Sequence, residues 1–288
     1  MKPAAFEYLA PRSLDETFAA LDHFGEDAKV LAGGQSLVAT MNFRLARPSA
    51  LVDIGHLTDL VGLDVGEHAV EIGALTSHRR LELGGDVGGP LGRLLSQAGH
   101  LVGHLPIRTR GTFGGSIAHA DPASEWCVLA ALLDATVLAT SPRGTREIAA
   151  SEHFITVFTT ALEPDEVIAG VRLPLLGPDH RAGFAEFSRR AGDFAIVMAM
   201  SSFRLRDGAI DDPRIALGGV ADRPVRVAAA EEILQGAAPG PAAFEEAAQA
   251  ASTSVDPHGD LQGPPEFRRD LVRAMTRRAL EQSLLAES

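Results

Sequence analysis

Two short glycine-rich stretches carry the residues best suited to chemistry in this chain of 288 residues. The first reads Ala-Gly-Gly-Gln-Ser from Ala32 to Ser36, and the second reads Gly-Thr-Phe-Gly-Gly-Ser from Gly111 to Ser116. Each has a Gly-Gly pair and a small polar residue, so several backbone N–H groups can approach one anion with no Cβ in the way. The hydroxyls of Ser36, Thr112 and Ser116 add donors. Two such loops, each between an expected strand and an expected helix, predict a site for a dinucleotide diphosphate.

Other site chemistry has weaker support in the sequence. No Gly-x-Gly-x-x-Gly follows an expected strand, and no Gly-x-x-x-x-Gly-Lys-Ser/Thr loop occurs. His100 and His104 have the spacing of two ligands to one metal, but the Glu of a His-Glu-x-x-His motif is absent, which favours helix-surface histidines. Cys127 falls in an apolar helix, which favours a buried small hydrophobe over a nucleophile.

Composition narrows the class of protein. The net charge of −12 argues against nucleic acid as a partner, because phosphate backbones bind basic faces. No apolar run reaches the ~18 residues of a transmembrane helix, and the acidic Glu7 does not suit a signal peptide. The single cysteine excludes an internal disulfide framework and an iron–sulfur cluster held by this chain alone. The cytoplasm is the expected location.

Three side chains near the loops allow two readings each. Lys29 precedes the first loop, where it either neutralises a phosphate or lies exposed at the start of a strand. Glu125 follows the second loop and either accepts ribose hydroxyls or is an acid favoured by the helix dipole. Phe194 follows Gly192-Asp193 and either covers a planar ring or belongs to the core.

The elements that position the first loop follow from hydrophobic spacing. Residues 13–16 (Ser-Leu-Asp-Glu) have the form of a capping box for a helix that ends near Gly25. A compact β–loop–α–β unit is then expected, with a strand over 29–32, a helix over 37–45 and a strand over 51–54.

The second loop lies in a longer stretch of short strands and helices. Pro90 can begin a helix whose apolar face includes Leu91, Leu94, Leu95, Ala98 and Val102. Asp121 suits the N-cap and Pro122 the first position of the helix that contains Glu125. Strands are expected over residues 60–63, 69–72, 137–139, 145–148 and 167–173.

The last third of the chain predicts an antiparallel sheet with helices. Prolines and a glycine break all periodicity over residues 173–179, which marks a domain boundary. Three strands are expected over 183–190, 195–206 and 214–220, with Asp207-Gly208 as a hairpin turn. Helices are expected over 227–235, 242–252 and 265–284. The last one carries an arginine cluster, read either as a solvated face or as a subunit contact: Arg268, Arg269, Arg273, Arg277 and Arg278.

Taken together, these segments resemble the FAD-binding medium subunit of the molybdenum hydroxylases, the family of xanthine, carbon monoxide and nicotine dehydrogenases. The resemblance runs from residues 6–11 through both glycine loops and residues 107–110 to Ser-Arg-Arg-Ala-Gly-Asp-Phe at 188–194. It implies an α+β protein in which a two-part FAD-binding domain of the vanillyl-alcohol-oxidase type precedes an α+β C-terminal domain with a three-stranded antiparallel sheet. The expected bounds are 1–58 and 59–176 for the two FAD-binding parts and 177–288 for the C-terminal domain.

The resemblance also implies which residues bind the cofactor. No catalytic or metal-binding residue is expected, and the FAD-binding residues are Lys29, Val30, Leu31, Ala32, Gly33, Gly34, Gln35, Ser36, Val102, Ile107, Gly111, Thr112, Phe113, Gly114, Gly115, Ser116, Glu125, Leu162 and Phe194. Two positions depart from the family pattern, because Ser116 stands where Asn is usual and Glu125 where Asp is usual. FAD is expected to bind non-covalently. Replacing Gly33 or Gly114 by Val is expected to abolish binding and largely preserve the fold.

The implied function is electron transfer within a larger oxidoreductase. Partner subunits are expected to carry the molybdopterin and two [2Fe–2S] clusters, and the FAD of this chain to pass electrons to an external acceptor. The implied assembly is a dimer of heterotrimers in the cytoplasm, in contact with the inner face of the membrane only through partners. Two alternatives stay open, a self-contained flavin oxidase or reductase and a non-redox nucleotide-binding module.

Overall fold

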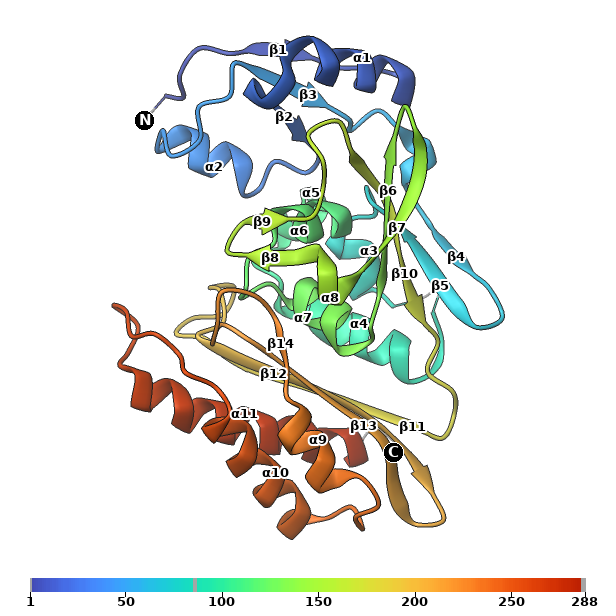
Figure 1. Cartoon of the computed structure of the whole chain (residues 1–288), viewed down its shortest axis with the longest axis vertical. Helices are drawn as coiled ribbons and strands as arrows, with labels where there is room; N and C mark the ends of the chain where they lie inside the picture. Colours follow the sequence, from blue (N-terminus) through green and yellow to red (C-terminus); the bar gives the residue numbers. More distant parts are fainter. Residues whose placement is uncertain (1, 85–86, 286–288) are drawn as a thin grey trace.

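The computed structural model describes residues 2–84 and 87–285 and arranges them in three layers along the long axis (Figure 1). An N-terminal subdomain lies at one end, a middle subdomain follows, and the C-terminal domain forms the other end. The predicted mixture of helices and sheets is confirmed. The exact boundaries predicted between the three parts stay predictions, and residues 286–288 of the last part lie outside the described residues.

The N-terminal subdomain is built on three parallel strands in the order β1-β3-β2. Its elements are β1 (Glu7–Leu9), α1 (Leu14–Phe24), η1 (Gly25–Asp27), β2 (Ala28–Leu31), α2 (Leu37–Asn42) and β3 (Ala50–Asp53). The predicted cap is confirmed, because the Ser13 side chain accepts a hydrogen bond from the Glu16 amide. The β–loop–α–β unit is also confirmed, with a helix shorter than expected. The sequence did not predict β1.

The middle subdomain has a five-stranded antiparallel sheet in the order β4-β5-β10-β6-β7, with helices gathered on one side of it (Figure 1). Its elements are η2 (Thr58–Leu60), β4 (Leu63–Val65), β5 (Ala69–Gly73), α3 (His78–Glu82), α4 (Gly89–Leu101), α5 (Leu105–Arg110), α6 (Phe113–His119), α7 (Glu125–Leu132), β6 (Thr136–Ser141), β7 (Gly144–Ala149), α8 (Ala150–His153), β8 (Phe154–Thr156), β9 (Thr159–Thr160) and β10 (Val167–Pro174). The predicted apolar face of α4 is buried, as expected.

Two local predictions in this subdomain are wrong. The strand expected over 60–63 begins only at Leu63, because Leu60 ends a 3-10 turn. Asp121 does not cap the following helix. Its carboxylate accepts from the Ala123 amide at 2.8 Å and closes a turn, so α7 begins later, at Glu125, after Ser124.

The C-terminal domain is a four-stranded antiparallel sheet covered by helices on its outer face (Figure 1). Its elements are β11 (His180–Phe187), β12 (Val197–Arg206), β13 (Ala209–Gly218), β14 (Val225–Arg226), α9 (Ala228–Leu234), α10 (Pro241–Thr253) and α11 (Pro265–Leu285). The three expected strands are present, and short β14 adds a fourth. Asp207 and Gly208 both have positive φ, as a tight hairpin requires. β13 starts earlier than predicted, because a bulge with Asp212 at φ +49° accommodates Pro213 within the strand.

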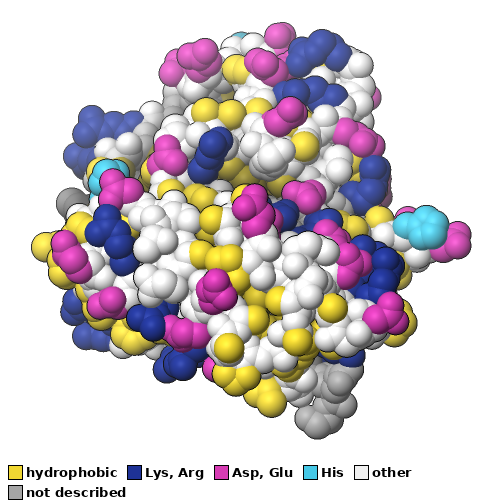
Figure 2. Space-filling view, turned by 60° about the horizontal axis from the view of Figure 1, so that its bottom comes forward, with side chains coloured by type: hydrophobic (Ala, Val, Ile, Leu, Met, Phe, Trp, Pro, Cys, Tyr) yellow, Lys and Arg dark blue, Asp and Glu magenta, His cyan; other side chains and the backbone are white. Residues whose placement is uncertain are grey.

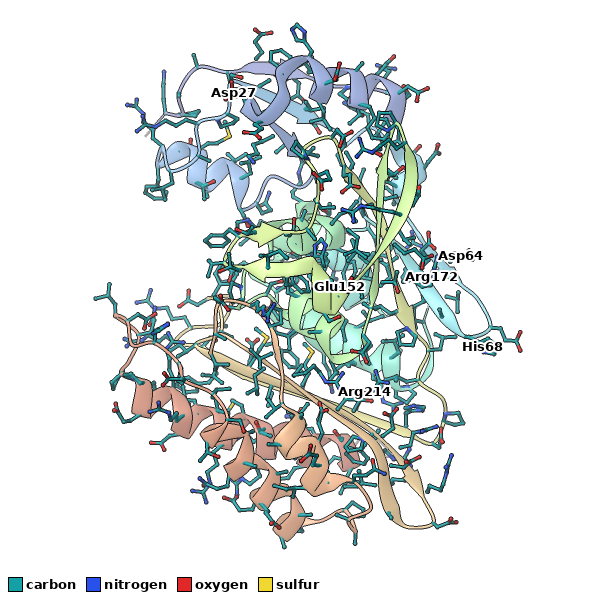
Figure 3. All side chains as sticks on the ribbon, in the orientation of Figure 1. Asp27, Asp64, His68, Glu152, Arg172 and Arg214 are labelled. Carbon is teal, nitrogen blue, oxygen red and sulfur yellow. The ribbon has the colours of Figure 1, made fainter. Side chains whose placement is uncertain are left out.

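The C-terminal sheet is buried on both faces because its side chains alternate. Met198 and Met200 of β12 pack into the core of the middle subdomain. Val197 and Phe203 point the other way, into the core beneath α10 and α11. At the edge of this junction Arg214 of β13 donates to Asp134 at 2.9 Å (Figure 3). These contacts join the C-terminal domain firmly to the middle subdomain.

The arginines of α11 do not all lie on a solvent-exposed face. Arg268 is buried, and its guanidinium donates to the carbonyls of Ile196 and Gly219 at 2.7 Å and to Asp260 at 2.8 Å. The solvated-face reading is therefore wrong for Arg268. Other arginines of this helix pair with carboxylates of the same chain. Acidic and basic side chains are interspersed on the face seen in Figure 2. Within the described ranges, no helix has the length and apolarity to cross a membrane.

Candidate dinucleotide-binding cleft

A cleft of about 930 Å³ lies between the N-terminal and middle subdomains. Both glycine loops line it, together with the strand β2, the start of α2 and the segment around β9 and β10. Its volume lies in the range of cofactor sites. The two loops, about eighty residues apart in the sequence, thus form parts of one site, as the sequence predicts.

The first loop leaves its backbone donors free. Among the described residues, no protein acceptor receives a hydrogen bond from the amides of residues 32–36. Gly34 has φ +71°, a conformation that favours glycine, and the Gln35 side chain donates to the Gly33 carbonyl at 2.9 Å to hold the turn. Consecutive free amides around such a turn form a concave site for an anion.

The second loop has a different backbone. Its Gly-Gly pair lies inside α6, and the four amides of residues 113–116 already have partners. Phe113 and Gly114 donate to the carbonyls of Thr76 and Ala74 at 2.9 Å. Gly115 donates to the Thr112 hydroxyl, and Ser116 donates to the Thr112 carbonyl, each at 3.1 Å. Residues 113–116 therefore contribute to the cleft through their shape and side chains, whereas the Thr112 amide has no acceptor among the described residues.

The glycines at the loop junction serve packing within the protein. A Cβ at Gly33 would lie 2.3 Å from the Arg110 carbonyl oxygen, and a Cβ at Gly114 would lie 2.5 Å from the Cβ of Ala74 and 2.8 Å from its carbonyl oxygen. Valine at Gly33 would push the N-terminal subdomain away from Arg110, and valine at Gly114 would push α6 away from Ala74 within the middle subdomain. These contacts argue against the expectation that the two variants largely preserve the fold, which stays a prediction.

Most of the predicted site residues meet in this cleft. Lys29 is exposed on β2, and Ser36 and Ser116 are half-buried on opposite loops. The predicted residues that line the cleft are Lys29, Val30, Leu31, Ala32, Gly33, Gly34, Gln35, Ser36, Gly111, Thr112, Gly114, Gly115, Ser116 and Leu162.

Five predicted residues lie outside the lining of the cleft. Val102 is buried at the end of α4, and Ile107 is half-buried on α5. Phe113 is fully buried in the core against Trp126. Phe194 is 61% exposed in the loop before β12, and Glu125 is buried at the start of α7. Contact between these five residues and a cofactor stays a prediction.

Glu125 faces the C-terminal domain. Burial, with a smaller contribution from the nearby Glu186 carboxylate of β11, raises the pKa of its carboxyl to about 8. Burial also raises the pKa of Glu186, to about 7. One Glu186 oxygen is buried with no hydrogen-bond partner. The surroundings at the junction between the domains therefore favour the protonated form of both carboxyls.

The cleft also contains three aromatic side chains that the sequence did not single out as binding residues. His78 of α3 lies beside Gly111, while His119 and Phe158 stack with ring centroids 4.7 Å apart. Phe158 has φ +56°, and its amide donates to the Ala120 carbonyl at 3.2 Å. No local motif marks these residues, because only the tertiary fold brings them to the glycine loops.

His100, His104 and Cys127 lie outside the lining of the cleft. Across the described chain, no group of three or more His, Cys, Asp or Glu side chains could hold a metal ion. His100 contacts Glu82 at 3.2 Å, and His104 precedes α5 as its cap residue. Cys127 is fully buried, and burial raises the pKa of its thiol. It is a small core residue, as predicted.

The cleft therefore has what a dinucleotide needs: free amides for a diphosphate, small residues that allow close approach, and aromatic side chains within the same cavity. The fold and site define a dinucleotide-binding protein.

Comparison with known proteins identifies the dinucleotide and the family. A family model for the FAD binding domain in molybdopterin dehydrogenase matches residues 4–176, and one for the CO dehydrogenase flavoprotein C-terminal domain matches residues 182–283. The 6-hydroxypseudooxynicotine dehydrogenase complex subunit alpha of Paenarthrobacter nicotinovorans is 38% identical over 285 residues, which cover 99% of this chain and 96% of that protein. The nicotine 6-hydroxylase medium subunit of the same organism is 36% identical over 97% of this chain and 98% of that protein.

A solved structure has the same fold over its whole length. Carbon monoxide dehydrogenase from Hydrogenophaga pseudoflava, in a form that lacks the Mo-pyranopterin moiety of the molybdenum cofactor, matches with a TM-score of 0.95 and 35% identity. The match covers 99% of both chains. The chain belongs to the FAD-binding medium subunits of the molybdenum hydroxylases, and its cofactor is FAD. The predicted family, fold class and cofactor are confirmed.

Proposed function

We propose that this chain is the electron-transfer subunit of a molybdenum hydroxylase complex. It takes electrons from [2Fe–2S] clusters on a small partner subunit and passes them to an external acceptor, while a large partner subunit oxidises the substrate at its molybdenum centre. The proposed assembly is a dimer of such heterotrimers. We place it in the cytoplasm. The cytoplasm is reducing, and this chain has one free, buried cysteine and so does not depend on a disulfide.

The cleft between the two glycine loops carries this proposal. Bound there, FAD would supply reversible one- and two-electron chemistry. The protein would hold the diphosphate with the amides of residues 32–36 and with Lys29, whose ammonium group is of opposite charge. One cysteine in the whole sequence cannot supply the four ligands of a [2Fe–2S] cluster, so a cluster that reduces this FAD would have to lie on another subunit.

Rapid mixing with reductant and substrate tests the proposal. The isolated chain, loaded with FAD, should be reduced by an artificial reductant and should not be reduced by heterocycles, aldehydes or carbon monoxide. Addition of the cluster-bearing and molybdenum-bearing subunits should make the loss of flavin absorbance depend on substrate. Substrate-driven reduction in the lone chain would contradict the proposal and favour a self-contained oxidase. A chain that binds no flavin would favour a non-redox nucleotide-binding module.

A further inference from the structure

A histidine on the wall of the cleft has no assigned part in the site. His78 is the first residue of α3, is only 4% exposed, and lines the cleft next to Gly111 and Thr112. A buried imidazole on a ligand-binding wall can donate or accept a hydrogen bond, and its tautomer decides which.

Trp126 fixes that tautomer. The indole N–H of this fully buried tryptophan donates to Nδ1 of His78 at 2.9 Å, and the two rings lie stacked with centroids 6.0 Å apart. An indole nitrogen only donates, so Nδ1 must present its lone pair. The proton of the neutral imidazole is therefore on Nε2.

The surroundings keep this imidazole neutral. Burial, with a smaller contribution from the Arg108 guanidinium, lowers the pKa of His78 to about 4. Arg108 lies on α5 and is held by the Glu82 carboxylate of α3 at 2.8 Å. The side chain is therefore a neutral donor over the whole physiological range of pH.

The Nε2 edge lies against the second glycine loop. A Cβ at Gly111 would approach Nε2 to 2.6 Å, so only glycine leaves room for the ring at this place. Among the described residues, no protein atom accepts a hydrogen bond from Nε2. The amides of residues 113–116 on the same wall already have partners. His78 thus offers this wall a fixed side-chain donor that the amides of residues 113–116 do not provide.

We propose that His78 binds the dinucleotide through an Nε2–H hydrogen bond to one of its acceptor atoms, and that Trp126 is the positioning residue that fixes the tautomer. The proposal deepens the function given above and rests on it, because the ligand is FAD.

Equilibrium binding of FAD to the full-length apoprotein tests the donor. His78→Phe keeps an aromatic ring and removes the donor, so it should weaken FAD binding about 10-fold. His78→Gln should stay within about 3-fold of the wild type, because its amide accepts from Trp126 and still donates toward the cleft. Equal affinity of His78→Phe and wild type would overturn the proposal. Absence of FAD binding by the wild type would instead overturn the proposed function.

Nitrogen NMR of the wild-type histidines tests the tautomer without any variant. Apoprotein labelled with ¹⁵N-histidine should show His78 with its proton on Nε2, and addition of FAD should shift that proton. Trp126→Phe should release the ring to a mixture of tautomers, which a purely structural role of Trp126 would not produce. A His78 proton on Nδ1 in the wild type, or no response of Nε2–H to bound FAD, would overturn the proposal.

Discussion

The first glycine loop leaves the amides of residues 32–36 without protein acceptors, whereas the second donates all four amides of residues 113–116 within the middle subdomain. The difference follows from local structure. The first Gly-Gly pair lies in a turn before α2 with Gly34 at φ +71°, while the second lies inside α6. A Gly-Gly pair thus predicts close approach of the backbone, but its partner can be a ligand or the protein itself.

The cleft is therefore asymmetric. The N-terminal wall supplies backbone donors and the charge of Lys29, and the opposite wall supplies a rigid surface, the Ser116 hydroxyl and the His78 donor. We expect the free energy of FAD binding to depend more on the first loop than on the second.

Gly34→Val gives the largest expected effect. A branched side chain at positive φ would turn the amides of the first loop away from their common direction. Loss of two hydrogen bonds to a charged diphosphate should weaken FAD binding about 100-fold. Titration of apoprotein with FAD, followed by flavin fluorescence, measures this change.

Gly208→Val is the matched control. Gly208 also has positive φ, at +78°, and a Cβ there would meet nothing within 4 Å. It carries similar backbone strain far from the cleft, so its FAD affinity should equal that of the wild type. If Gly34→Val and Gly208→Val bind FAD with equal affinity, the first loop does not bind the diphosphate.

The helices α2 and α7, which lie downstream of the first and second glycine loops, also differ in their surroundings. Leu37 and Thr40 of α2 border the cleft, but α7 begins with Glu125 buried near Glu186 and Asp121. The folded-state pKa of Glu125, about 8, lies above its ordinary value of 4.5, so the folded protein holds a proton that the unfolded chain loses between these values. Stability should fall as pH rises through this window.

Glu125→Gln should remove that dependence, because glutamine stays neutral with nearly the same shape. At about pH 9 the apoprotein variant should be more stable than wild type by up to about 5 kcal/mol, and the difference should vanish below about pH 4.5. Urea unfolding of the two apoproteins across this range measures it. A difference that does not change with pH would show that Glu125 is ionised in the folded protein.

Ser116→Ala gives the smallest expected effect. Ser116 is one of two hydroxyl residues of the second loop that line the cleft, with Thr112, and the loss of a single hydroxyl donor should weaken FAD binding about 3-fold. Ser36→Ala is a control with the same chemical change on the first loop. If Ser116→Ala weakens FAD binding about 100-fold and Ser36→Ala does not, the second loop contributes more to FAD binding than the first, contrary to our expectation.

The sequence predicted the elements whose signals are local. Ser13 at the start of α1, Asp207-Gly208 between β12 and β13, and the first glycine loop between β2 and α2 depend on neighbouring residues, and each has the predicted place. The second glycine loop was expected after a strand, and that expectation is wrong, because the loop follows α5 and its Gly-Gly pair lies inside α6. The helix start at Asp121 was wrong because an Asx turn and an N-cap use the same carboxylate–amide chemistry.

Tertiary contacts limited the prediction of the site. The packing of Gly33 on Arg110, the hydrogen bond from Trp126 to His78 and the burial of Arg268 join segments far apart in the sequence. No spacing rule contains them. The similarity to known proteins identifies the family and the cofactor FAD. The different roles of the two loops, with free amides in the first and paired amides at residues 113–116 of the second, are inferred from the backbone hydrogen bonds alone.

Amide NMR of the FAD-bound protein tests most directly which of the two loops binds the diphosphate. Scalar coupling between an amide nitrogen and a phosphorus nucleus across a hydrogen bond identifies which N–H groups hold the diphosphate. We expect such couplings from amides within residues 32–36 and none from residues 113–116. Couplings from residues 113–116, with none from residues 32–36, would contradict the assignment of the diphosphate to the first glycine loop.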